Sequence, residues 1–289
     1  MKKLLLLLIT SLAFSTVTDI DGNVYETVQI GDQLWMAENL MVTHYNEGSE
    51  IPTDYSDFEW DELDDTETGA YAVYNDDLSN ADTYGNIYNW YAVDDSRGIC
   101  PVGWHVPTDD EFKELEMFLG MSQEEADNSG YRGTNEGSKL AGNADLWNSG
   151  NLEQNSEFGT SGFTGLPGGD RGTYGTCSYM GIYGDFWSST EYPSDDLEIA
   201  WYRTLGCDYS GVIRYSTYKQ YGFAVRCLTN DYILGDINGD EILNVLDIVL
   251  MINMILSNEY SVVADVNEDG SVDILDVVIM VNILVGGLP

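Results

Sequence analysis

Residues 236–247, with the sequence DINGDEILNVLD, are followed 29 residues later by a second copy, DVNEDGSVDILD, at residues 265–276. Each copy runs into an apolar segment, since residues 245–256 and residues 274–285 each contain ten apolar residues in twelve. Such a segment makes about three turns of an α-helix, apolar on nearly every side. The stretch before the first copy is too short for another helix. The duplication therefore predicts two loop-then-helix units at the C-terminal end.

Both loops place oxygen atoms at the positions that a calcium-binding loop requires. Side-chain oxygens come from loop positions 1, 3, 5, 9 and 12, and a backbone carbonyl comes from position 7. Calcium is a hard cation that takes six to eight oxygen ligands. The duplication predicts two calcium ions; two metal-free turns rich in Asp and Asn are the alternative. The predicted ligands are Asp236, Asn238, Asp240, Ile242, Asn244 and Asp247 in the first loop, and Asp265, Asn267, Asp269, Ser271, Asp273 and Asp276 in the second.

The two loops differ at position 6, where the chain must turn sharply. The second loop has Gly270 there and four carboxylates among its ligands, whereas the first has Glu241 and three carboxylates. A residue with a side chain is strained in a turn of this kind. We therefore expect the first site to be the weaker one.

The apolar helices indicate a protein partner. A unit of about 55 residues is too small to bury this much apolar surface against itself, so part of that surface should face another protein. Packing against the upstream domain, or self-association, is the alternative. The duplicated pattern resembles the type I dockerin family over residues 234–289. The resemblance implies calcium-dependent docking onto a cohesin module of a scaffold or cell-surface protein, as in a cellulosome-like assembly.

The resemblance also implies which residues face the cohesin. Many dockerins carry Ser or Thr and Lys or Arg there, whereas this chain carries mainly apolar residues, so we expect a mainly apolar contact. Because the two copies are nearly equivalent, docking in either of two orientations is expected. The residues are Val245, Leu246 and Asn253 in the first copy, and Ile274, Leu275 and Asn282 in the second.

Residues 16–230 predict a loop-rich α+β domain. An Asp-Gly-Asn turn at residues 21–23 lies between two short alternating runs, which favours a hairpin. The acidic residues 45–68 have no repeating apolar face and predict a loop. Late strands are expected at residues 200–205, 212–216 and 222–228.

Helix starts are marked by capping-box patterns. Thr108 and Glu111 precede an amphipathic run that continues to Gly120, which predicts the clearest helix of this domain. Ser122 with Glu125 gives a weaker second start.

Six motifs in this region match a known family. Together they resemble the Fibrobacter succinogenes major paralogous domain over roughly residues 16–230. That family is similar in fold to C-type lectins and to formylglycine-generating sulfatase-modifying enzymes. The resemblance implies a C-type-lectin-like α+β fold, followed here by the small all-α dockerin. The motifs are WMAENL at 35–40, YGNIYNWYAV at 84–93, CPVGWHVPT at 100–108, GFTGLPGG at 162–169, FWSSTE at 186–191 and FAVRC at 223–227.

The N-terminus predicts export. Two lysines, an apolar run and small residues form a bacterial-type secretory signal over residues 1–15. The protein is therefore expected to be extracellular, where an even number of cysteines favours two disulfides. The four cysteines allow three pairings, which the sequence alone leaves open. The fold resemblance suggests nested pairs, Cys100–Cys227 outside and Cys177–Cys207 inside.

The charge balance excludes some classes of function. The chain has 50 acidic residues against 11 Lys and Arg, a formal net charge of −39. Nucleic acids are bound by basic clusters, so nucleic-acid binding is excluded, and binding to an anionic membrane surface is disfavoured. The apolar segments are too short to span a membrane. Residues 19–95 contain 20 acids and no Lys or Arg, which indicates a solvated acidic surface.

Few residues point to catalysis. His44 and His105 are the only histidines, and neither shows the pattern of a catalytic triad. The paired late cysteines of a formylglycine-generating enzyme and the sugar-binding tripeptides of C-type lectins are also absent from the sequence. We expect a non-catalytic protein, with a dockerin-borne carbohydrate-active or protein-modifying enzyme as the alternative.

The central domain is expected to act as an adhesion or recognition module, in the setting of polysaccharide breakdown. Its Tyr-rich stretches, residues 174–183 and 209–221, are the better candidates for binding a glycan or a cell-surface ligand. The predicted domain order is a signal peptide at 1–15, the central domain at 16–230 and the dockerin at 234–289.

Overall fold

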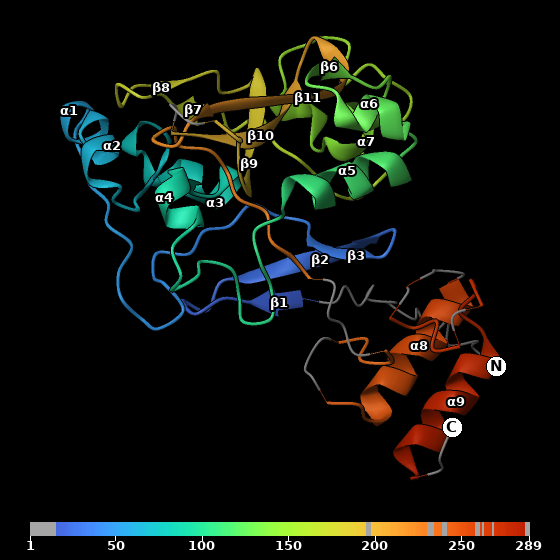
Figure 1. The fold of residues 1–289 in the computed structure, drawn as a ribbon. Coiled ribbons are helices and arrows are strands. Elements are labelled where there is room, and N and C mark those ends of the chain that lie inside the picture. Colours follow the sequence, from blue (N-terminus) through green and yellow to red (C-terminus); the bar gives the residue numbers. More distant parts are fainter. Residues whose placement is uncertain are drawn as a thin grey trace, which may run out of the picture. The chain divides into compact units, whose positions relative to one another are not determined.

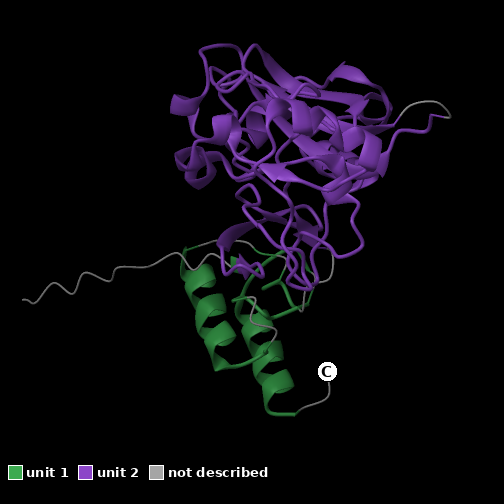
Figure 2. Cartoon of the chain, turned by 90° about the vertical axis from the view of Figure 1, so that its left-hand side faces the viewer, with its two compact units in different colours: residues 1–16, 232–289 green, residues 17–231 purple. Residues whose placement is uncertain are grey.

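The structure is a computed structural model that describes residues 16–194, 198–229, 234–238, 242–257, 261, 263–267 and 269–286. The chain divides into two compact units, one of residues 17–231 and one of residues 232–289 together with residues 1–16 (Figure 2). The predicted signal peptide and the predicted ligand Asp240 lie outside the described residues. Across the described ranges, no helix combines the length and the apolar character needed to cross a membrane.

Residues 17–231 form the predicted mixed α+β domain, with several antiparallel sheets. One sheet joins the two ends of the domain, because the last strand pairs with the N-terminal hairpin: Leu228 lies opposite Trp35. The predicted hairpin turn at residues 21–23 is confirmed, because the strands on its two sides are neighbours in this sheet. Gly22 has φ 86°, and the Asp19 carboxylate accepts hydrogen bonds from the backbone of Asp21 and Asn23. The strand order is β1 (Thr16–Thr18), β2 (Val24–Ile30), β3 (Gln33–Met36) and β12 (Leu228–Thr229).

The second sheet is the centre of the domain. Arg203 pairs with Arg214, and the neighbouring Tyr202 pairs with Tyr215. Since successive side chains of a strand point to opposite faces, the two pairs lie on opposite faces of the sheet. The predicted strands at 200–205 and 212–216 fall within it. The strand order is β6 (Gly130–Arg132), β11 (Tyr209–Tyr218), β10 (Ile199–Gly206) and β9 (Tyr183–Glu191).

The third late strand was predicted too long. Of residues 222–228, only Leu228 belongs to a strand, while Phe223 and Ala224 form isolated bridges to Tyr88 and Phe186. Two small sheets complete the β-structure, and Figure 1 shows the second of them beside β9 and β10. They are β4 (Tyr71–Ala72) with β5 (Ile87–Tyr88), and β7 (Asp170–Arg171) with β8 (Cys177–Ser178).

Both predicted helix starts are confirmed. Thr108 and Glu111 form a complete capping box, as do Ser122 and Glu125. The helices of the domain are α1 (Asp57–Asp61), α2 (Leu63–Thr66), α3 (Ala81–Tyr84), α4 (Trp90–Val93), α5 (Asp109–Phe118), α6 (Gln123–Asp127) and α7 (Glu136–Leu140), with 3₁₀ turns η1 (Tyr74–Asp76), η2 (Leu78–Asn80) and η3 (Ala144–Leu146).

The prediction of a loop over residues 45–68 is wrong in its second half, where α1 and α2 lie. A capping box between Ser56 and Glu59 starts α1. Trp60 is fully buried and its Nε1 donates to the Gln220 carbonyl at 2.9 Å. A helix this short shows no repeating apolar face, so one buried Trp and a cap hold it in place.

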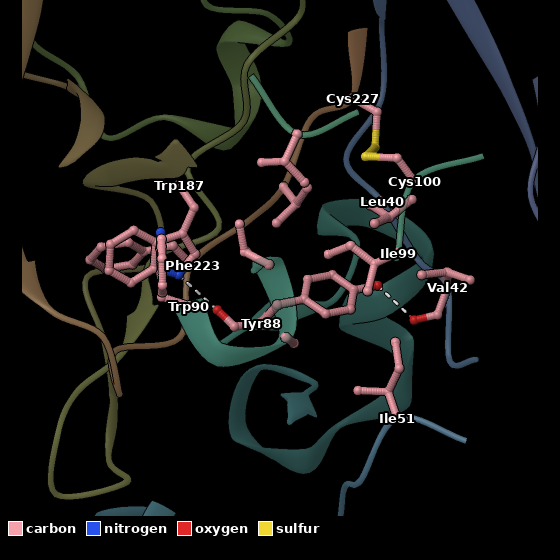
Figure 3. Packing of buried hydrophobic residues seen from close by; sticks show 14 of the residues in the cluster. Leu40, Val42, Ile51, Tyr88, Trp90, Ile99, Cys100, Trp187, Phe223 and Cys227 are labelled. Carbon is pink, nitrogen blue, oxygen red and sulfur yellow. Dashed lines mark hydrogen bonds between the residues drawn. A yellow bond between two sulfur atoms is a disulfide. The ribbon is translucent and has the colours of Figure 1, made fainter. Parts of the chain in front are cut away.

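The main core lies around Tyr88 and Trp187 (Figure 3). Trp187 Nε1 donates to the Tyr88 carbonyl at 2.9 Å, and the Tyr88 hydroxyl donates to the Val42 carbonyl at 2.7 Å. The disulfide Cys100–Cys227 closes one side of this core across 127 residues of sequence. In the chain-entropy model a loop of this length is worth about 5 kcal/mol. The predicted outer disulfide is confirmed.

The predicted inner disulfide is not formed, because Cys177 and Cys207 are both free thiols. Each packs in a different apolar cluster. Cys177 lies against the cluster that contains Trp60, where it accepts a hydrogen bond from the Asn75 backbone at 3.3 Å. Cys207 is buried in the cluster that contains Phe112.

The C-terminal unit contains the two predicted helices, α8 (Val245–Ser257) and α9 (Ile274–Leu284). They pack through a small core that includes Met251 and Met280, both with no exposed surface. Gly235 is required at the start of the first loop, because it has φ 92° and a Cβ there would lie 2.2 Å from Met280 Sδ.

Candidate functional site

The last predicted ligand of each loop closes the loop in the same way. One oxygen of Asp247 accepts from the Asn238 backbone at 3.4 Å and the other accepts from the Asn244 backbone at 2.8 Å. The equivalent Asp276 accepts from Asn267 at 3.2 Å and from Asp273 at 2.8 Å. Loop positions 3 and 9 are therefore held to position 12 in both copies, and the sequence repeat is a structural repeat.

The other end of the second loop is held by its first residue. The Asp265 carboxylate accepts from the backbone of Asp269 at 3.0 Å and of Gly270 at 2.8 Å. Gly270 has φ 87°, which is the turn that the sequence predicted at position 6. The Ser271 backbone N–H, next to the predicted carbonyl ligand, donates to Asp269 Oδ1 at 3.0 Å.

Position 9 of each loop also caps the following helix. Asn244 Oδ1 accepts from the Leu246 backbone at 2.7 Å, and Asp273 Oδ1 accepts from the Leu275 backbone at the same distance. The Ile242 carbonyl, a predicted ligand, accepts from Asn244 Nδ2 at 2.9 Å. The first loop is described only at its two ends, since residues 239–241 lie outside the described residues.

The donor set of the loops fits a hard cation. Asp236, Asp247, Asp265 and Asp276 are buried, with exposed fractions of 8, 0, 2 and 0%. The sequence has no Lys, Arg or His after Arg226 to balance their charge, and buried carboxylates need a counter-charge or several hydrogen bonds. Within the described residues, no three Asp, Glu, His or Cys side chains are gathered closely enough to hold a metal ion. The oxygens of Asp247, Asp265 and Asp276 accept hydrogen bonds from the loop backbone.

All six residues predicted to face a partner are exposed. Val245 and Leu246 are 68% and 50% exposed, and their equivalents Ile274 and Leu275 are 64% and 54% exposed. Asn253 and Asn282, which lie further along α8 and α9, are also exposed. The apolar helices thus leave a duplicated apolar surface uncovered in this unit, as the small size of the unit predicted.

Both histidines contact carboxylates. His44 Nδ1 lies 2.6 Å from Asp21, and His105 Nε2 lies 2.8 Å from Glu111. Glu111 is the capping residue of α5. Burial acts to raise its pKa, but the hydrogen bonds from His105 and Thr108 lower it to about 2. His105 therefore has a structural explanation at the start of α5.

A pocket of about 500 Å³ lies in the central domain and brings the two Tyr-rich stretches together. Tyr174, Tyr179 and Tyr183 from the first stretch and Tyr215 and Tyr221 from the second line it. Two acidic residues that the sequence reasoning missed, Asp170 and Asp185, line it as well. Among 50 acids no local pattern marks these two, because strand pairing alone brings them to one place.

Comparison with known families agrees with this division of the chain. The family described as Fibrobacter succinogenes major domain matches residues 28–229. The family described as Dockerin type I domain matches residues 234–285. No curated protein and no solved structure matches the chain significantly.

Proposed function

The chain belongs to the Fibrobacter succinogenes major domain family, and from its dockerin we propose that it is a secreted, non-catalytic modular protein. Its C-terminal dockerin binds calcium and docks onto a cohesin module of a scaffold or cell-surface protein, in a cellulosome-like assembly. Its central domain acts as an adhesion or recognition module in polysaccharide breakdown. The observation that supports the docking function is the duplicated apolar surface: Val245 and Leu246 are exposed after the first acidic loop, and Ile274 and Leu275 are exposed after the second.

The dockerin is proposed to hold two calcium ions, one in each loop. The first would be held by Asp236, Asn238, Asp240, the Ile242 carbonyl, Asn244 and Asp247. The second would be held by Asp265, Asn267, Asp269, the Ser271 carbonyl, Asp273 and Asp276. Bound calcium would place a positive charge beside the four buried carboxylates. The backbone contacts of Asp247 and Asp276 support this proposal, because they already hold positions 3, 9 and 12 of each loop together.

The docking contact is proposed to be mainly apolar and to work in two orientations. Leu246 and Leu275 hold equivalent positions in the two copies and are about equally exposed, at 50% and 54%. A cohesin that engages one copy would therefore find nearly the same surface after the dockerin is turned to present the other.

The central domain is proposed to have the C-type-lectin-like fold that its family resemblance implies. Two observations support this proposal. The Cys100–Cys227 disulfide corresponds to the outer pair that the resemblance suggests, and the sheet that contains β1 and β12 joins the two ends of the domain. The disulfide also supports an oxidising, extracellular location.

The docking function is tested by binding the full chain to a panel of immobilised cohesins in calcium and in excess chelator. We expect binding in calcium and none in chelator. Leu246→Asp or Leu275→Asp alone should weaken binding less than about 3-fold, and the double variant should weaken it by roughly 100-fold or more. Leu256→Asp, at a more exposed apolar position near the end of α8, is the control and should have no effect.

Absence of capture from the whole panel in calcium would contradict the docking function. Loss of binding in either single variant would contradict the two orientations and leave the docking function intact. The rival enzymatic function is tested by turnover on a panel of polysaccharides, which we expect to be nil.

A further inference from the structure

The floor of the pocket in the central domain is one face of the β6–β11–β10–β9 sheet. Thr204 pairs with Asp185 on one side and with Ile213 on the other, and Ile213 pairs with Tyr131. These four residues form a row across all four strands. Tyr202 and Tyr215 form the next row and also line the pocket. The segment that contains β7 and β8, which lies beside β9 and β10 in Figure 1, contributes Asp170 and Tyr179 to the lining.

Two carboxyl groups lie buried in this pocket. Asp170 is 8% exposed and Asp185 is 5% exposed. The Thr204 hydroxyl donates a hydrogen bond to Asp185 Oδ1. Among the residues that the structure describes, none donates a hydrogen bond to the Asp170 carboxyl or forms an ion pair with it. An acid held in this way has no internal compensation for a negative charge.

No basic side chain of the described domain is available to supply that compensation. Eleven Lys and Arg minus Lys2 and Lys3, which lie outside the described residues, leave nine. Each of the nine donates a hydrogen bond to an acceptor that is not part of the pocket lining. None of the nine lines the pocket itself.

The pKa values of the two acids reflect this burial without a basic partner. Burial raises the pKa of Asp170 to about 7 and that of Asp185 to about 8. A positively charged ligand would stabilise both carboxylates, whereas a neutral ligand would leave their charge uncompensated.

The remaining walls are aromatic. Seven tyrosines and Phe223 line the pocket, and the rings of Tyr179 and Tyr183 lie 5.2 Å apart between their centres. Aromatic faces carry negative electrostatic potential and attract ammonium groups. The volume, about 500 Å³, lies within the range typical of small-molecule sites.

We propose that this pocket binds a small organic cation, with an ammonium group seated between the carboxyls of Asp170 and Asp185 and the surrounding tyrosine rings. This inference rests on the proposed role of the central domain as a recognition module and gives that role a ligand class. The net charge of −39 attracts cations toward the domain and repels anions.

The test measures binding of choline to the full chain by calorimetry in buffer with calcium, against 3,3-dimethylbutan-1-ol, its neutral analogue of the same shape. We expect choline to bind about 10-fold or more tighter than the neutral alcohol. Choline keeps its charge at every pH, so any pH dependence reports on the protein.

Choline affinity should rise between pH 6 and pH 9, as the two carboxyls lose their protons. Five of the other titratable groups near them should stay protonated over this range, because burial raises the pKa of each. They are Tyr74, Cys177, Tyr183, Tyr202 and Tyr221.

Variants at two pocket positions test the roles of the charge and of the aromatic ring. Asp170→Asn should weaken choline about 10-fold, reduce the rise in affinity with pH and leave the weak binding of the alcohol unchanged. Tyr215→Leu should weaken choline, whereas Tyr215→Phe, which keeps the aromatic face, should not. Asp32→Asn removes one charge at an exposed turn outside the pocket and should change nothing. A cooperative unfolding transition in each variant shows that it is folded.

Equal affinity for choline and the alcohol, no pH dependence, or an unaffected Asp170→Asn variant would overturn the inference. Binding of neutral oligosaccharides in the pocket with no binding of choline would also overturn it, while leaving the recognition role of the domain in place. If no choline binds and the dockerin still captures cohesin, the cation site alone is wrong.

Discussion

The two faces of the β9–β10–β11 sheet bury acidic side chains in opposite ways. On the face toward α5, Asp109 and Glu116 are 4% and 0% exposed and are surrounded by arginines. Arg203 Nε donates to Glu116 at 2.6 Å, and its Nη1 donates to Asp109 at 2.8 Å. Arg214 binds Asp109 through two nitrogens, at 2.8 and 2.6 Å. Arg132 binds both oxygens of Glu116, at 2.8 Å each.

On the opposite face, Asp170 and Asp185 are buried to a similar degree without any arginine. Burial alone acts to raise the pKa of an acid. It does raise those of Asp170 and Asp185, whereas at Asp109 the hydrogen bonds and charges of Arg214 and Arg203 outweigh it and lower the pKa. The partner, not the depth of burial, therefore decides whether a buried acid is ionised at neutral pH.

The difference between the two faces indicates a structural role for the acids that are paired with arginines and a binding role for the acids in the pocket. Three of the 11 basic residues of the chain are placed in the arginine-rich face, which is filled by α5. The other face keeps its acids unpaired at a pocket. A chain this poor in bases leaves acids unpaired at a site where a ligand can supply the missing charge.

The largest expected effect comes from breaking the arginine-rich face. Glu116→Gln removes the charge that Arg132 and Arg203 share, so the buried guanidinium of Arg132 loses its carboxylate partner and that of Arg203 keeps only Asp109. Breaking a buried ion pair in this way costs about 3–5 kcal/mol. Denaturant unfolding of the full chain in calcium should show this loss in the transition of the central domain.

The matched control for this prediction is Glu124→Gln, the same change at an exposed position of α6. It should alter stability by less than about 0.5 kcal/mol. A Glu116→Gln protein as stable as this control would show that the arginine network contributes nothing net to folding.

The second prediction is a gain in stability and concerns the face of the sheet that lines the pocket. The pKa of Asp185 is raised to about 8 in the folded protein, against an ordinary value of about 4. Its contribution to stability is therefore fully present below about pH 4 and is lost as the pH rises toward 8. Asp185→Asn removes this loss, so the stability of the variant relative to the parent should rise by about 4 kcal/mol between pH 5 and pH 9.

Thermal unfolding of both proteins across pH 5–9 checks this prediction. Asp109→Asn should behave in the opposite way and destabilise the domain at pH 7, because the pKa of Asp109 is lowered by its arginines. If both Asn variants lose stability to the same extent at pH 9, the two faces do not differ as proposed.

Local sequence signals predicted the local structure of this chain well. The capping box at Thr108 and Glu111, the turn at Gly22 and the two loop-then-helix copies depend on neighbouring residues only, and each was found. The prediction failed where the determinant is distant. The helix α1 starts at a local capping box, but its position in the domain depends on the contact of Trp60 with Gln220, 160 residues away. Cys177 and Cys207 stay apart because each joins a different apolar cluster.

The candidate sites divide along the same line. The repeated loops were predictable because all the ligands proposed for calcium lie within 12 consecutive positions of each loop. The Tyr-rich stretches could be suspected from composition. Asp170 and Asp185 could not, because only the pairing of Asp185 with Thr204 and the contact of β7 with β9 bring them beside the tyrosines.

The smallest expected effect tests the single hydrogen bond that the pocket face does provide. The Thr204 hydroxyl donates to Asp185 and acts to lower its pKa, against the larger effect of burial. Thr204→Val keeps the shape of the side chain and removes this donor, so the pKa of Asp185 should rise further, by about one unit. Carboxyl carbon NMR across pH 5–10 measures the shift. Thr217→Val, which removes a hydroxyl from the same pocket lining, should leave the titration unchanged. A fall in the pKa of Asp185, or equal shifts in both variants, would mean that another donor stabilises this carboxylate. The two faces of the sheet would then differ only in how strongly they stabilise their buried carboxylates.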